Sequence, residues 1–178
     1  QDANGDITDW PLGLSPPAHR TAVNIIHEVV FVFFRATGLV TKLGEDPGNA
    51  ENTVAITTKP TGAPVWAGTT IGNPDFANPI PFTDTDTQMS VRVYSPTAGI
   101  PFVTKLEYAQ NEGSGDAQAN ETVVEGWQTL TWTYNLEARD DYTRFVILPD
   151  LGTVGAGETY YIDNITLVGD DGGDGGDG

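Results

Sequence analysis

The sequence predicts an all-β protein, specifically an antiparallel β-sandwich of the jelly-roll type with about nine strands. Short runs of alternating apolar and polar residues recur between turn clusters that draw on 21 glycines and 12 prolines. No segment shows the 3.6-residue period of an amphipathic helix over a helical length. With 178 residues, 38% of them hydrophobic, the chain is long enough to bury one core.

We divide the chain into three parts. Residues 1–24 are polar, proline-bearing and aperiodic, so we expect an N-terminal arm. Residues 25–168 form the predicted sandwich, and residues 169–178, which are only Gly and Asp, resemble a linker to a further domain. The predicted strands, in chain order, are 25–34, 53–59, 65–71, 87–95, 102–109, 121–124, 127–135, 143–148 and 158–168.

Two consecutive strands, 87–95 and 102–109, are joined by the short connection "SPTAGIP", so we expect them to pair. Side-chain parity places the apolar residues of 87–95 on one face and the polar residues on the other. The outer faces of the pair would form one polar surface, either an ordinary solvent-facing sheet or a binding face. That surface would carry Arg92, Tyr94, Lys105 and Glu107.

Three tryptophans are assigned by their surroundings. Trp132 shares parity with Leu130 and Tyr134, which predicts a core residue. Trp66 in "VWAGTT" is either a core residue or an exposed platform. Trp127 follows Glu125-Gly126 at a rim position, where half-buried packing and ligand contact are both open.

Composition excludes several classes of function. Acidic residues outnumber basic residues 25 to 8, giving a formal charge of −17, which disfavours nucleic acids and anionic membranes as partners. The chain has no cysteine, so thiol catalysis and disulfides are excluded. No apolar run is long enough to span a membrane. A chain that starts at Gln1 fits a mature secreted protein whose leader has been removed.

Catalytic motifs are missing from the sequence, and we expect no enzymatic activity. His19 lies in the arm and His27 begins an apolar strand, positions typical of structural histidines. No nucleophile elbow, zinc-protease motif or dinucleotide fingerprint occurs. Glu107 is the best carboxylate for a glycosidase pair, but Lys105 is its same-face neighbour and opposes the desolvation that a catalytic acid needs.

Several motifs over about residues 50–168 resemble non-catalytic carbohydrate-binding sandwiches attached to secreted laminarinase-type enzymes and surface glycan-binding proteins. They are "VWAGTTI", "VRVYSPTAGIPFVTKLEYA", "EGWQTLTWTY" and "GETYYIDNITL". The resemblance implies a secreted, extracellular or cell-surface module that binds a polysaccharide, with β-glucan of the laminarin type as the leading ligand. Sugars stack their C–H faces on aromatic rings and need hydrogen-bond donors and acceptors for their hydroxyls. The implied carbohydrate-binding residues are Trp66, Arg92, Tyr94, Lys105, Glu107 and Trp127.

The last predicted strand changes phase at Asp163-Asn164, which predicts a β-bulge or a residue turned to hold a ligand. The family pattern at this place resembles the terminal-strand aspartate that binds structural calcium in carbohydrate-binding sandwiches. Calcium takes six to eight oxygen ligands. The resemblance therefore implies a Ca²⁺ site at Asp163, with Glu28 or Asp46 and a backbone carbonyl as partners.

A second interpretation is a structural subunit of an extracellular filament or adhesin. The apolar run "VVFVFF" at 29–34 can complete the sheet edge of a neighbouring copy, and a free arm can reach a second subunit. The partners would then be identical subunits instead of a polysaccharide.

Overall fold

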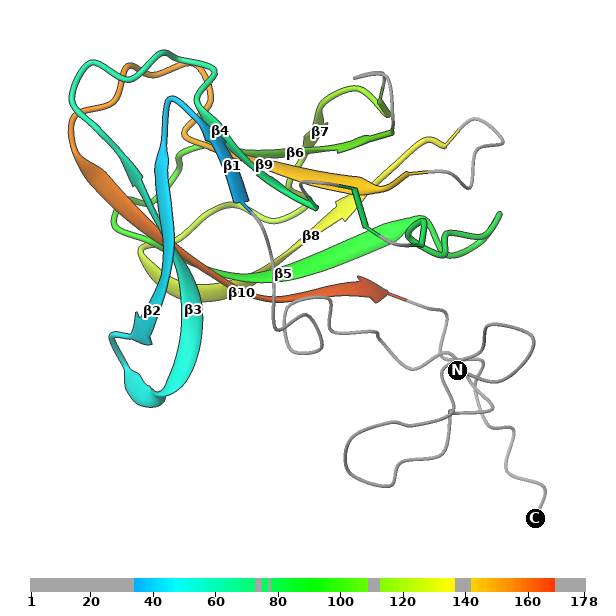
Figure 1. Ribbon diagram of the computed structural model, residues 1–178, viewed down its shortest axis with the longest axis horizontal. Helices are drawn as coiled ribbons and strands as arrows, with labels where there is room; N and C mark the ends of the chain where they lie inside the picture. The colour runs from blue at the N-terminus through cyan, green and yellow to red at the C-terminus, as the bar shows by residue number, and fades with distance from the viewer. Residues whose placement is uncertain (1–33, 73–74, 77, 109–112, 137–141, 169–178) are drawn as a thin grey trace.

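The computed structural model describes residues 34–72, 75–76, 78–108, 113–136 and 142–168, which form a β-sandwich (Figure 1). Over these residues the secondary structure consists of strands and turns, and no helix long and apolar enough to cross a membrane is found. The strands are β1 (Phe34–Thr37), β2 (Val40–Asp46), β3 (Asn49–Lys59), β4 (Gly68–Ile71), β5 (Gln88–Ser95), β6 (Phe102–Glu107), β7 (Ala117–Gln118), β8 (Gly126–Thr133), β9 (Arg144–Pro149) and β10 (Glu158–Val168).

The strands form two five-stranded sheets. Sheet A has the order β2-β3-β10-β5-β8, and sheet B has the order β1-β4-β9-β6-β7. Every pairing within them is antiparallel. The predicted all-β antiparallel sandwich is therefore confirmed.

The core lies between the two sheets and follows the alternation of the sequence. Met89, Val91 and Val93 of β5 are fully buried, while their neighbours along the strand are only partly buried. Trp132 is also fully buried and donates its indole N–H to the Phe102 carbonyl oxygen at 3.1 Å. This hydrogen bond satisfies the one polar atom of a large core side chain, so its burial carries no desolvation penalty.

Three element predictions were wrong. Segment 121–124 is not a strand: Glu121 instead accepts hydrogen bonds from the Thr131 backbone N–H and hydroxyl, both at 2.6 Å. The short β7 takes its place in the chain, and β4 starts only at Gly68 because 65–67 form a turn. Strand β2 was missed because most of "VTKLGED" is exposed and does not alternate.

The expected pairing of the strands joined by "SPTAGIP" was also wrong. β5 is hydrogen-bonded to β10 on one side and to β8 on the other, so it has no free edge for β6. β6 crosses to sheet B and pairs with β9. Arg92 and Tyr94 therefore lie on one sheet, and Lys105 and Glu107 on the other.

The predicted irregularity in the last strand is confirmed. The register between β10 and β5 shifts between Asp163 and Thr166, and Asn164 has a positive φ of 46°. Asparagine tolerates this left-handed conformation better than most residues. Because the bulge adds one residue, Ile165 turns to the core, on the same side as Ile162, and both are fully buried.

Several predictions concern residues that the structure does not describe. The N-terminal arm, the "VVFVFF" run up to residue 33, Glu28 and the Gly/Asp tail lie outside the described residues. The described part of 25–168 forms the sandwich.

Candidate functional site

Three aromatic side chains lie in register across the outer face of sheet A. Tyr161 of β10 pairs with Tyr94 of β5, and Tyr94 pairs with Trp127 of β8. The ring centroid of Tyr94 is 5.4 Å from that of Tyr161 and 5.7 Å from that of Trp127. The ring centroids of Trp127 and Tyr161 are 6.1 Å apart. All three side chains are partly exposed. We call Tyr161, Tyr94 and Trp127 the aromatic row.

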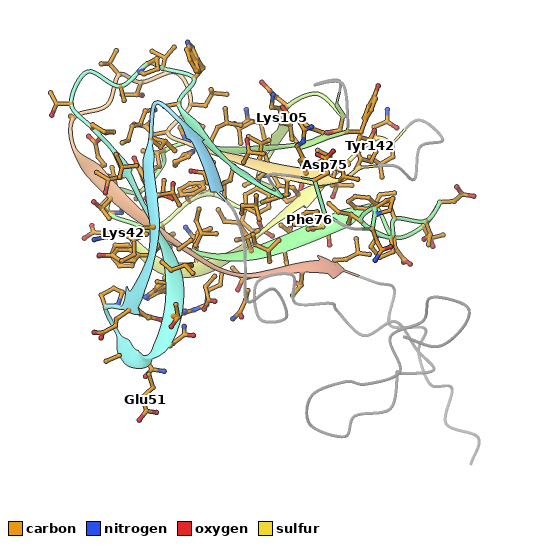
Figure 2. The ribbon with its side chains drawn as sticks, viewed as in Figure 1. Lys42, Glu51, Asp75, Phe76, Lys105 and Tyr142 are labelled. Carbon is orange, nitrogen blue, oxygen red and sulfur yellow. The ribbon has the colours of Figure 1, made fainter. Side chains whose placement is uncertain are left out.

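The same register continues to the other edge of the sheet. Tyr161 also pairs with Ile56 of β3, which pairs with the exposed Lys42 of β2. Lys42 and the exposed Glu51 mark the two-stranded hairpin that extends from sheet A (Figure 2). One line of side chains thus crosses all five strands, with its aromatic part over β10, β5 and β8.

The guanidinium of Arg92 lies over the indole ring of Trp127. The guanidinium carbon lies 3.7 Å from the ring centroid, which is close contact for a cation–π interaction. Within the described residues the enclosed indole N–H of Trp127 meets no hydrogen-bond acceptor. A buried N–H cannot reach a ligand, so Trp127 offers the ring surface rather than a hydrogen bond.

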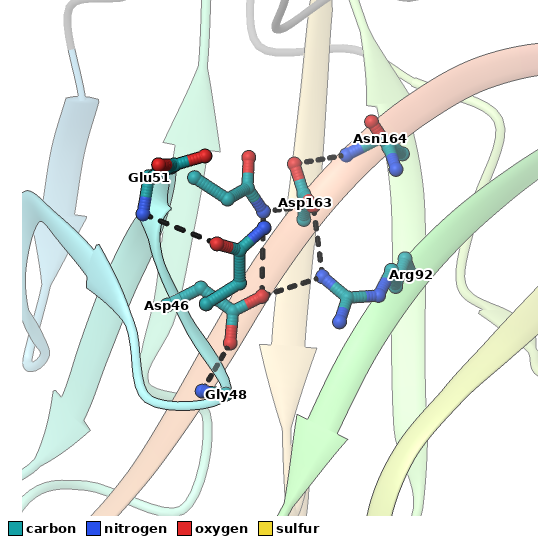
Figure 3. Close-up of polar contacts among 8 residues, drawn as sticks. Asp46, Gly48, Glu51, Arg92, Asp163 and Asn164 are labelled. Atoms are coloured by element: carbon teal, nitrogen blue, oxygen red, sulfur yellow. Dashed lines mark hydrogen bonds and ion pairs between the residues drawn. The ribbon is translucent and has the colours of Figure 1, made fainter.

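Two buried carboxylates form ion pairs with the same guanidinium through its Nη1 atom (Figure 3). Arg92 Nη1 lies 2.9 Å from Asp46 Oδ2 and 3.0 Å from Asp163 Oδ2. Asp46 is 3% exposed and Asp163 2% exposed, whereas the Arg92 side chain is 31% exposed. Charge-assisted hydrogen bonds of this kind fix the position of the guanidinium and, through it, the indole.

The sequence elements that position these carboxylates are the β2–β3 hairpin and the bulge of β10. Asp46 Oδ1 accepts the Gly48 backbone N–H at 2.8 Å inside the hairpin turn. Asn52 donates from its amide to Asp46 Oδ2 at 3.3 Å and to Asp163 Oδ2 at 3.0 Å. Asp163 Oδ1 accepts the Asn164 backbone N–H at 2.9 Å. The hairpin is thereby tied to the centre of the sheet.

Hydrogen bonding sets the protonation of Asp46. Burial alone raises the pKa of this carboxyl group, but hydrogen bonds from Gly48, Arg92 and Asn52 together hold the pKa below its ordinary value of 3.8. Asp46 is therefore charged at neutral pH, as its ion pair with Arg92 requires.

Sequence reasoning found three of the four side chains that meet on this face. Arg92, Tyr94 and Trp127 are brought together, as a shared binding surface requires. Tyr161 was missed. The signal was present in the Tyr160-Tyr161 pair: alternation buries Tyr160, and so must turn its neighbour to the outer face.

Lys105 and Glu107 lie elsewhere, on sheet B. Lys105 Nζ pairs with Glu107 Oε1, and Arg144 of β9 contacts both Glu107, at 3.9 Å, and Asp75. Lys105 and Asp75 lie together in Figure 2, away from Lys42 and Glu51. These two predicted residues form an ion-pair network and do not join the aromatic row.

Trp66 is exposed in the β3–β4 connection. Its side chain is 54% exposed, and its neighbour Val65 and Val154 of the β9–β10 connection are exposed as well. The Gly152 backbone N–H donates to the Val65 carbonyl oxygen at 3.0 Å, which ties the two connections together. The core interpretation of Trp66 was wrong, and its role as a sugar platform stays a prediction.

The predicted calcium ligand Asp163 shares the Arg92 guanidinium with one further carboxylate, that of Asp46. No group of three His, Cys, Asp or Glu side chains with metal-binding geometry occurs in the described ranges, and Glu28 lies outside them. Asp46 and Asp163 do approach the same point, but Arg92 Nη1 already bridges them. Among the described residues, Asp46 and Asp163 are the two carboxylates at this point, and the Ca²⁺ site stays a prediction.

The chain resembles several solved structures in its fold. No protein-family profile and no curated protein matches the sequence. A family 11 carbohydrate-binding module of the cellulosomal cellulase Lic26A-Cel5E of Clostridium thermocellum is similar over 84% of this chain and 94% of the module, at 13% identity and a TM-score of 0.53. A Clostridium thermocellum family 11 module in complex with a β-1,3-1,4-mixed-linked tetrasaccharide is similar over 83% of this chain and 94% of the module, at 14% identity and a TM-score of 0.50.

Enzymes also contain this fold as one part of a larger chain. An exo-β-agarase is similar over 80% of this chain at 9% identity and a TM-score of 0.57, but this chain spans only 24% of it. The two family 11 carbohydrate-binding modules, by contrast, are covered over 94% of their length. At these identities the likeness establishes a shared β-sandwich fold.

Proposed function

We propose that the protein is a secreted, non-catalytic carbohydrate-binding module that recognises a polysaccharide on the outer face of sheet A. The single observation that carries this proposal is the aromatic row. Three partly exposed rings from adjacent strands lie within 6.1 Å of one another, centroid to centroid, and form one compact aromatic surface for stacking. A sugar chain that crosses the strands would contact this cluster as one surface.

The surroundings of the row suit sugar hydroxyls. The phenol groups of Tyr94 and Tyr161 both donate and accept hydrogen bonds. Thr129 lies opposite Arg92 on the exposed edge strand β8, and adds a further hydroxyl beside Trp127. The fold is that of known carbohydrate-binding modules. β-Glucan of the laminarin type is the ligand we favour, because of the sequence motifs described above.

A non-catalytic module should bind the polysaccharide without hydrolysing it. Glu107, the best catalytic candidate by sequence, is paired with Lys105 on the opposite sheet and is not near the aromatic row. A reducing-sugar assay with laminarin, mixed-linked β-glucan and agarose tests this directly. Release of sugar ends by the pure protein would contradict the non-catalytic assignment.

Affinity electrophoresis in gels that contain each polysaccharide tests the binding itself. We expect retardation by a neutral β-glucan that is lost in Trp127→Ala and Tyr161→Ala and kept in Val154→Ala. Val154 is a matched control because it is an exposed apolar residue outside the aromatic row. Trp66→Ala, measured in the same gels, shows whether the β3–β4 connection also contacts the polysaccharide.

A structural subunit remains the second candidate, on one specific observation. β2 is an edge strand of sheet A with two exposed apolar residues, Val40 at 58% and Leu43 at 51%. An edge of this kind can pair with a second copy of the chain. Absence of glycan binding, together with high-mass species in size-exclusion chromatography, would favour this candidate over the first.

A further inference from the structure

The charge balance around Arg92 decides which polysaccharides the aromatic row accepts. We propose that the site selects uncharged glycans and rejects uronate-containing or sulfated ones, and that Asp46 and Asp163 determine this selectivity. The inference rests on the proposed function, since it specifies the ligand of the same face.

Arginine beside aromatic rings is the usual receptor for a carboxylate or sulfate group, because its guanidinium binds these anions in a bidentate manner. Here the positive charge of the group is already offset through one of its nitrogen atoms. The Nη1 atom of Arg92 lies within 3.0 Å of both Asp46 Oδ2 and Asp163 Oδ2. Two carboxylates therefore face one guanidinium, and the cluster keeps one negative charge beneath the row.

Burial makes this negative charge effective. Both carboxylates are at most 3% exposed, so counterions and water screen them less than surface groups. The pKa of Asp46 is held below its ordinary value by its hydrogen bonds, so the carboxylate is not neutralised at neutral pH. An anionic sugar over Trp127 would meet a repulsive field, because two carboxylates outweigh the single positive charge of Arg92.

Of the other cations that the structure describes, the one exposed on this face is too distant to reverse the effect. Lys42 lies on β2, three strands from Tyr94 and four from Trp127. At a strand spacing of about 4.8 Å these separations are about 14 and 19 Å, beyond the Debye length of about 8 Å in physiological salt. The net charge of −17 of the whole chain acts in the same direction as the cluster.

Arg92 instead serves the row as a support for Trp127. Its guanidinium covers one face of the indole at 3.7 Å, and the two carboxylates fix the guanidinium. A ring held in this way presents its remaining surface without an ordering cost, which suits the stacking of an uncharged pyranose. Asp46 and Asp163 are positioning residues that do not contact the ligand themselves.

The test compares laminarin and mixed-linked β-glucan, which are neutral, with alginate and polygalacturonate, which are anionic. Calorimetry at about 20 mM and about 500 mM salt separates charge effects from stacking. We expect the neutral glycans to bind with the same affinity at both salt concentrations. At low salt we expect the anionic glycans to bind at least about tenfold more weakly than the neutral ones.

Variants identify the residues responsible. Asp163→Asn and Asp46→Asn each remove one negative charge while keeping an oxygen for the neighbouring backbone N–H, and we expect them to raise binding of alginate several-fold relative to laminarin. Glu51→Gln is the matched control, because it removes the same charge from an exposed position in the same hairpin without touching Arg92. Two variants at separate positions guard against one that fails to fold.

The outcomes separate this inference from the function on which it rests. Binding of alginate equal to or tighter than that of laminarin overturns the selectivity and leaves carbohydrate binding intact. An equal response of Glu51→Gln and Asp163→Asn shows a general charge effect and overturns the role of the two aspartates. No binding of any glycan overturns the proposed function and the selectivity together.

Discussion

The outer faces of the two sheets carry similar residue types in different arrangements. On sheet A, Arg92 is held by two buried carboxylates and packs against an aromatic ring. On sheet B, Lys105 and Arg144 form ion pairs with Glu107 and Asp75 that are partly open to solvent. Sheet B also has a small aliphatic cluster, and its described residues form no aromatic row on the outer face. Charged side chains alone therefore do not mark the binding face; the rings and the buried counter-charges distinguish it.

The largest expected effect concerns stability on sheet A. Arg92→Ala leaves Asp46 and Asp163 buried, adjacent and without their counter-charge. Removing one partner of a fully buried pair costs about 3–5 kcal/mol, and the partial exposure of Arg92 reduces our expectation to about 2 kcal/mol. Urea denaturation followed by circular dichroism measures the change. A variant as stable as the wild type would show that the network contributes nothing to folding.

Binding provides the second test of the comparison. Trp127→Ala removes the ring that Arg92 supports, and central aromatic residues of binding sites contribute about 2 kcal/mol or more, which corresponds to about thirtyfold in Kd. We expect that loss of affinity for a neutral β-glucan, with little change in melting temperature because Trp127 is outside the core cluster. Undiminished affinity would remove Trp127 from the site.

Acid should weaken the Arg92 network of sheet A. The folded-state pKa of Asp46 is lowered, so its contribution to stability is fully present above the ordinary value of 3.8 and is lost as the pH falls through the lower folded value. Asp46→Asn should therefore be less stable than the wild type at pH 7, with a difference that shrinks below about pH 4. Melting curves from pH 7 to pH 3 measure it; a difference that does not depend on pH would contradict the ionised pair.

The smallest effect is expected on sheet B. Lys105→Ala breaks an ion pair in which the lysine side chain is 34% exposed, and such pairs contribute about 0–1 kcal/mol. We expect a loss of stability below about 0.5 kcal/mol and unchanged glucan binding. A loss of binding as large as that of Trp127→Ala would place the ligand on sheet B and invert the comparison.

The sequence allowed the faces of single strands to be predicted, but not the neighbours of those strands. Alternation identified Met89 and Trp132 as core residues and located the irregularity at Asp163, because these features depend on local periodicity. The pairing of β5 with β10 joins segments about seventy residues apart, and no local pattern specifies it. For that reason Lys105 was placed on the wrong sheet, whereas the outward face of Tyr161 was already indicated by local alternation.

The central claim is that the aromatic row binds a neutral polysaccharide, and calorimetric titration of laminarin into the wild type and Trp127→Ala tests it most directly. We predict saturable binding to the wild type and loss of that binding in the folded variant. Equal binding by the two proteins, or no heat from the wild type with laminarin or mixed-linked β-glucan, would contradict the account.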